Sequence, residues 1–133
     1  MMPFEFTIKG PPVSLQTRNR ARLQQWKRDV AQAASQAWQH QNATTDEVSV
    51  VITYYYEGSS PDVDNIIKPI QDALVGIVYL DDDQVVDTKS RKRKIDGSFR
   101  LRGASAVLLS GFSGGDEFLY IKVEEAPDME ALD

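Results

Sequence analysis

Alternating hydrophobic and polar positions open the chain and predict a first strand over residues 4–9, whose inward positions are Phe4, Phe6 and Ile8. The Gly-Pro-Pro stretch at 10–12 ends that strand. Between about residues 18 and 41 the spacing changes to that of an amphipathic helix with an alanine-rich inner stripe, formed by Leu23, Trp26, Val30, Ala33, Ala34, Ala37 and Trp38. The β-branched and aromatic run at 47–56 predicts a second strand.

A second helix is predicted after the Gly-Ser-Ser-Pro turn at 58–61. Its apolar face has helical spacing and consists of Ile66, Ile67, Ile70, Ala73, Leu74 and Ile77. Pro69 lacks a backbone donor and crowds the preceding turn, so the helix either starts as late as Ile67 or kinks.

Three further strands are predicted towards the C-terminus, at 84–95, 104–109 and 117–123. A glycine-rich turn at 111–115 separates the last two. The order β-α-β-α-β-β-β predicts an α+β fold, a mixed β-sheet with two helices packed on it. We expect a single domain over 1–124 and an acidic C-terminal tail over 125–133.

Composition narrows the chemistry. The chain has no cysteine and a single histidine, His40, which excludes disulfides, thiolate metal sites and sites built from several histidines. It shows neither a signal peptide at its start nor an apolar stretch of membrane-spanning length. We therefore expect a cytoplasmic protein.

The net charge of −5 is unusual for a DNA-binding protein, but the charges are unevenly distributed. Five basic residues lie in 18–28 and seven in 89–102, whereas 116–133 holds seven acids and one lysine. Outside that acidic end, 14 basic residues nearly balance 13 acidic ones. Candidate phosphate contacts are Arg18, Arg20, Lys89, Arg91, Lys92, Arg93 and Lys94. The alternative is that these runs are solvated surface.

The acidic residues of 61–87 form the most informative pattern. Asp62 and Asp64 precede the second helix, and Asp64, Lys68 and Asp72 follow at four-residue spacing along one polar stripe. The run Asp81-Asp82-Asp83 lies after the helix. Clustered carboxylates repel one another unless a cation offsets their charge, and oxygen-only ligands suit Mg²⁺, with Mn²⁺ as a substitute. Lys68 would then stabilise charge on phosphate oxygens.

Each of these residues could also have an ordinary structural role. Asp62 or Asp64 alone could be a helix cap, residues 81–83 a solvated turn, and Lys68 a surface lysine paired with Asp64 and Asp72.

Taken together, the segment resembles the RusA family of Holliday junction resolvases. The family pattern has Asp-x-Asp-Asn, a lysine, Asp-Ala-Leu, and an Asp-Asp pair before x-Gln-Val. The matching residues here are Asp62-Val63-Asp64-Asn65, Lys68, Asp72-Ala73-Leu74 and Asp81-Asp82-Asp83-Gln84-Val85. Fixed internal spacing over this length is far more specific than an isolated acidic pair.

The resemblance implies a RusA-like fold and a Mg²⁺-dependent homodimeric endonuclease that nicks four-way DNA junctions in recombination and repair. It implies that Asp62, Asp64 and Asp82 are catalytic metal ligands, with Asp81 at a further metal-binding position, and that Lys68 is the essential lysine. Asp72 matches an acidic position, and Asp83 takes no role. The alternatives are a catalytically silent branched-DNA-binding protein of the same fold and a metal-dependent nucleotide phosphohydrolase.

Overall fold

The computed structural model describes residues 2–39, 41–58, 62–95, 100 and 102–127. His40, Pro61 of the predicted turn and the acidic end from residue 128 lie outside the described residues. No helix in the described part of the chain is both long and apolar enough to span a membrane.

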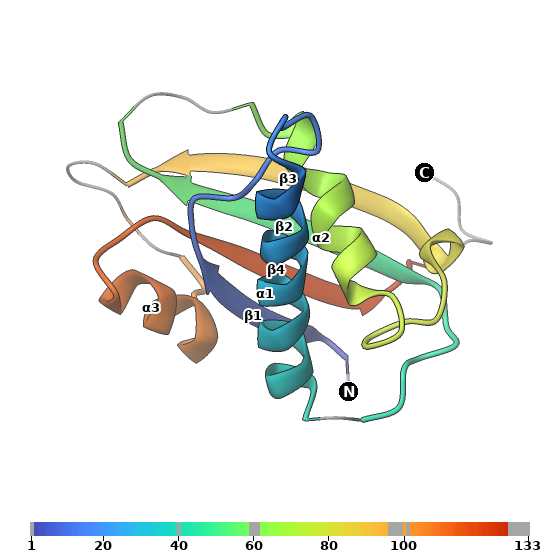
Figure 1. Ribbon diagram of the computed structural model, residues 1–133. Helices are drawn as coiled ribbons and strands as arrows, with labels where there is room; N and C mark the ends of the chain where they lie inside the picture. Colours follow the sequence, from blue (N-terminus) through green and yellow to red (C-terminus); the bar gives the residue numbers. More distant parts are fainter. Residues whose placement is uncertain (1, 40, 59–61, 96–99, 101, 128–133) are drawn as a thin grey trace.

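Four strands form one mixed sheet in the order β1-β4-β2-β3 (Figure 1). Their bounds are β1 Phe4–Lys9, β2 Val48–Tyr56, β3 Val85–Lys94 and β4 Phe118–Glu125. β3 runs parallel to β2, while β4 is antiparallel to both β1 and β2. The parallel pair is possible because α2 crosses over between β2 and β3. The predicted α+β mixed sheet is confirmed, with β3 at one edge.

Three helices cover the sheet: α1 (Arg20–Trp38), α2 (Ile67–Leu74) and α3 (Ala106–Ser113). Figure 1 shows α1 and α2 side by side across one face. The main core lies beneath them and includes Trp26, Trp38 and the tyrosines at 54 and 56, all buried. The two tryptophans of the predicted inner stripe therefore pack in the core.

The start of α2 explains how the chain accommodates Pro69. A short 3₁₀ turn, η1 (Asp64–Ile66), leads directly into α2, which begins at Ile67. Pro69 is therefore in the first turn of α2, where its missing N–H and fixed φ cost least. Of the two predicted outcomes, the late start is the one observed.

The predicted strand at 104–109 is wrong, because this segment begins α3. Short apolar runs do not distinguish a strand from a helix. The deciding contacts are a cap, in which Ser105 Oγ accepts from the Leu108 N–H at 3.1 Å, and the packing of the helix on Phe118. A Cβ atom at Gly111 would overlap the Phe118 ring, so Gly111 belongs to this helix and not to the predicted turn. The sheet thus carries three helices rather than two.

Candidate active site

Two hydrogen bonds hold the acidic segments along the edge strand β3. Ser90 Oγ donates to the Val63 carbonyl at 3.2 Å, and Gln71 Nε2 donates to Thr88 Oγ1 at 2.7 Å. The turn that precedes α2 and the helix α2 itself consequently lie along the same face of β3.

Lys68 connects α2 to the aspartate run that follows it. Its Nζ lies 2.9 Å from Asp72 Oδ1 and 3.1 Å from Asp82 Oδ2, and Lys27 Nζ approaches the other Asp72 oxygen at 3.5 Å. The hydrogen bond to Asp72, followed by that to Asp82, raises the pKa of Lys68 above its ordinary value. Lys68 therefore stays protonated between two carboxylates. Of the ordinary surface role considered from sequence, the pairing with Asp72 is observed, whereas the described residues show no ion pair between Lys68 and Asp64.

Asp62 accepts two hydrogen bonds in the turn just before η1. Its Oδ1 accepts from the Asp64 N–H at 2.9 Å and its Oδ2 from Asn65 Nδ2 at 3.2 Å. Both oxygens are engaged, yet Asp62 and Asp64 remain exposed to solvent. The helix-cap role considered for Asp62 or Asp64 from sequence is not observed, because Val63 and Ile66 occupy the cap positions of η1 and α2 and neither makes a side-chain cap hydrogen bond. The two bonds of Asp62 leave its outer lone pairs able to bind another group.

A capping box fixes the second acidic run. Asp81 is the cap of the 3₁₀ turn η2 (Asp82–Gln84), and Gln84 Oε1 accepts from the Asp81 N–H at 3.0 Å. The Asp83 N–H donates to Asp81, which lowers the pKa of Asp81, and the Asp81 charge raises the pKa of Asp83. Gln84 also donates to the Thr44 carbonyl at 2.9 Å. This turn presents Asp82 to Lys68.

Two side chains anchor the site without having been given a role from sequence: Gln84, which lies in the matched motif, and Gln71. The signal for Gln84 was present, because Asp81-x-x-Gln84 has the spacing of a capping box. Nothing in the local pattern marks Gln71, whose partner Thr88 lies 17 residues away.

The donor chemistry of the site fits a hard divalent cation, since every available ligand atom is a carboxylate or amide oxygen at an exposed edge. The described side chains do not, however, bring three carboxylates into one group able to hold a metal. Carboxylates without a cation repel one another. In this structure the carboxylate oxygens accept hydrogen bonds from the Lys68 ammonium and from nearby backbone N–H groups instead. The assignment of Asp62, Asp64, Asp81 and Asp82 as ligands stays a prediction.

The basic residues of β3 are divided between the two faces of the sheet. Lys92 and Lys94 share a face with Thr88 and Ser90, the residues that contact α2 and the Asp62–Asp64 turn. Arg91 lies on the other face, where its Nε donates to Thr53 Oγ1 at 3.2 Å. Lys89 and Arg93 share that face by the same alternation.

The first basic cluster lies beside the acidic turn. Arg20 donates to the Leu15 carbonyl at 3.0 Å, and the Leu15 N–H donates to the Asn65 carbonyl at 2.8 Å. The loop before α1 is therefore joined to η1, with Arg18 and Arg20 exposed.

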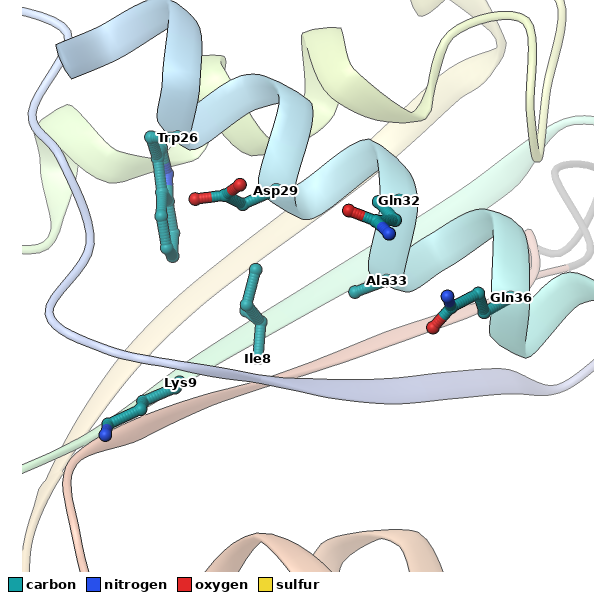
Figure 2. A pocket seen from close by; sticks show the side chains of 7 residues that line it. All are labelled: Ile8, Lys9, Trp26, Asp29, Gln32, Ala33 and Gln36. Atoms are coloured by element: carbon teal, nitrogen blue, oxygen red, sulfur yellow. The ribbon is translucent and has the colours of Figure 1, made fainter.

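A hollow of about 350 Å³ lies elsewhere, between α1 and β1 (Figure 2). Trp26 and Asp29 descend into it from α1, and Ile8 rises from β1. Asp29 is the single carboxylate among its lining residues, so this hollow lacks the acidic chemistry found beside β3.

Comparison with known proteins agrees with the geometry of the acidic segments. Over 34 residues, the chain is 53% identical to the uncharacterized protein YqaN of Bacillus subtilis strain 168. That segment is 26% of this chain and 24% of YqaN, so the match spans about a quarter of the relative's length. The family model described as endodeoxyribonuclease RusA matches residues 6–101, more than half of the chain, and includes the whole acidic segment. The chain therefore belongs to the RusA endodeoxyribonuclease family.

Proposed function

We propose that this protein is a structure-selective endodeoxyribonuclease that resolves four-way DNA junctions by metal-dependent phosphodiester hydrolysis. The observation that carries the proposal is Lys68, held 2.9 Å from Asp72 and 3.1 Å from Asp82 at an exposed edge. The carboxylates can bind a cation, and the protonated lysine and the basic strand beside them can bind a phosphate. Membership of a family of endodeoxyribonucleases supports this assignment.

The proposed ligands of Mg²⁺, or of Mn²⁺ in its place, are Asp62, Asp64 and Asp82, with Asp81 holding the turn that presents Asp82 and remaining available to the ion. When bound, such an ion lowers the pKa of a water and polarises the phosphodiester. Lys68 would orient Asp82 and donate to a non-bridging phosphate oxygen. Lys92 and Lys94, on the same face as the acidic turn, would hold the DNA backbone, together with Arg18 and Arg20.

We further propose a homodimer, because a four-way junction has two equivalent strands to cut and a two-fold dimer supplies two equivalent sites. Two apolar surfaces that could make this contact, on α1 and on the tyrosine-rich strand β2, are already in use within the chain. The large apolar side chains of α1 and the side chains of Tyr54 and Tyr56 are buried within the chain itself; those of α1 are Leu23, Trp26, Val30 and Trp38. Leu80 lies beside the Asp81 cap and has 58% of its surface exposed, so this apolar side chain is available for a contact with a second copy.

The alternative is a branched-DNA-binding protein without activity. It is favoured by one observation, namely that the described carboxylates do not form a preassembled metal group. A labelled four-way junction and a plain duplex, each incubated with Mg²⁺ or with EDTA, decide between the two. We expect paired nicks in the junction with Mg²⁺, no cutting in EDTA, and little cutting of duplex. Junction binding without nicks under every condition would favour the inactive protein.

The domain limits of 1–124 and 125–133 remain predictions, as does the cytoplasmic location. Limited proteolysis with mass spectrometry tests the limits, because cleavage confined to the acidic end would leave the sheet intact.

A further inference from the structure

A second basic site lies on the face of the sheet away from the aspartates. A hollow of about 210 Å³ opens where β3 ends, and four of its lining residues are cations: Arg93, Lys94, Arg100 and Arg102. Its other lining residues are aromatic or aliphatic, including Tyr55 and Phe112. Among the described residues, no carboxylate lines the hollow and none of these four cations takes part in an ion pair. The hollow is thus both positively charged and aromatic.

The aromatic wall is rigidly built. Tyr55 stacks on Phe118 with ring centroids 4.8 Å apart and planes at 17°, and Phe112 meets Tyr55 edge-on at 4.9 Å. Because Gly111 has no side chain, α3 lies directly on the Phe118 ring and holds Phe112 at the hollow. Burial raises the pKa of Tyr55, and the nearby Arg91 and Arg93 guanidinium groups oppose that rise. Cationic groups therefore lie close to the Tyr55 ring.

This site differs from the acidic edge in both position and origin, although Lys94, the last residue of β3, lines the hollow and also lies on the face of the acidic turn by strand alternation. Arg93 and Tyr55 are paired across β3 and β2, on the side opposite Ser90 and the Asp62–Asp64 turn. Arg102 and α3 lie beyond residue 101, where the match to the family ends. Part of the site is therefore built by a segment outside the family's matched region.

We propose that this hollow binds unpaired DNA, with one base stacking at Phe112 and Tyr55 and the adjoining phosphates contacting the arginines. Stacking platforms beside a cationic track are the usual way in which proteins hold single strands. The hollow is smaller than the roughly 300 Å³ of the smallest drug-sized pockets, which suits a single base with its phosphates outside. Binding there requires neither a metal nor cleavage, so it does not rest on the nuclease proposal.

Two other roles for this hollow are protection of the sheet edge and binding of an acidic peptide. Each explains fewer of its features. Lysines on an edge strand keep it from pairing with another sheet, which explains charge on β3 but not the aromatic wall or Arg100 and Arg102. The acidic end of this chain is another source of negative charge. However, β4 pairs Glu125 with Val48, so it ends at the opposite end of the sheet from Tyr55. An acidic peptide from another protein would supply charge but no planar ring to match the stacked wall.

The test is fluorescence anisotropy in EDTA with a short labelled oligothymidylate and a duplex of equal length. Phe112→Leu keeps an apolar side chain but removes the ring, so we expect oligothymidylate binding to weaken about tenfold with duplex binding unchanged. Arg102→Gln should lower the slope of log affinity against log salt by about 0.7. Lys122→Gln is the matched control, because Lys122 lies on the same face near the other end of the sheet and should leave the slope unchanged. A thermal melt of each variant confirms that it is folded.

Equal losses for oligothymidylate and duplex in Phe112→Leu would overturn the proposal, as would no loss for either. If thymidine monophosphate competed as well as the oligomer, the hollow would be a site for a single nucleotide and not for a DNA strand. An acidic peptide that binds in an Arg102-dependent way, while oligothymidylate does not bind, would identify a protein partner instead. Junction cleavage by the wild-type protein with Mg²⁺ is measured separately, so either proposal can fail without the other.

Discussion

The ammonium of Lys68 lies 3.1 Å from the carboxylate of Asp82, a residue 14 positions further along the chain. The same nitrogen is 2.9 Å from Asp72, one helical turn after Lys68. A single side chain thus joins α2 to the turn before β3. Its local partner follows from helical spacing, while its distant partner depends on how the chain crosses from α2 to the edge strand.

Lys68→Gln should reduce junction cleavage about 100-fold or more, because it removes a preorganised donor to the phosphate and the partner of Asp82. Half of its side chain is exposed, so the free energy of unfolding should change by no more than about 1 kcal/mol. Lys27→Gln is the matched control, since Lys27 also pairs with Asp72 but has no described contact with Asp82. Cleavage rates and thermal melts of the two variants are compared. If both variants lost cleavage equally, the loss would come from disturbing the shared partner Asp72 and not from Lys68 itself.

Asp82→Asn should abolish cleavage while preserving or improving junction binding, because it removes a proposed metal ligand and a negative charge near phosphate. Asp83→Asn removes the same charge one residue away, from a side chain with no assigned role, and should cut at a rate close to wild type. Single-turnover cleavage and a binding titration in EDTA distinguish the two. Wild-type cleavage by Asp82→Asn would remove Asp82 from the site. Asp64→Asn, measured in the same way, should also abolish cleavage while preserving or improving junction binding.

The two faces of β3 should differ in their contribution to junction binding. Lys92 and Lys94 share the face of the acidic turn, so replacing both with glutamine should lower the salt slope of junction affinity by just under two units, at about 0.9 for each lost contact. Replacing Arg91 and Arg93, on the other face, should change that slope little. Titrations in EDTA across a salt series measure both. An effect confined to the arginine pair would mean that the junction binds the α3 side.

Gly111→Ala should destabilise the protein by about 1–3 kcal/mol, because the new methyl group overlaps the buried Phe118 ring and forces α3 outward. Gly114→Ala is the control in the same segment, where the added Cβ would meet only the Gly111 carbonyl oxygen at an ordinary 3.5 Å. Urea unfolding gives the free energy for each variant. A Gly111→Ala protein as stable as wild type would show that α3 does not depend on this contact.

The proposed dimer should be visible by light scattering at micromolar concentration, without DNA or metal. Because a two-fold junction is cut at paired positions, loss of the dimer should separate paired nicks into single ones. A monomer that still makes paired nicks would contradict the proposal.

Sequence patterns alone determined β1 and α1, because alternation in one and helical spacing in the other run over enough residues for one period to dominate. They also determined β2, from its β-branched and aromatic run, and β3. They also placed the acidic motif around α2, since its spacing is local. Local patterns could not decide the segment at 104–113. Its short apolar run satisfies both helix and strand, and the helix is selected by the contact between Gly111 and Phe118, seven residues apart. Tertiary packing overrides such weak local preference.

The candidate site shows the same division. Its residue types, its spacing and therefore its oxygen-only chemistry were readable from the chain, because ligand preference depends on the atoms present. Tertiary structure decided that Lys68 reaches Asp82, that Gln71 and Gln84 anchor the acidic segments, and that the basic residues of β3 face two ways. These are contacts between segments that meet only after β3 has paired alongside β2, and no local period encodes that pairing.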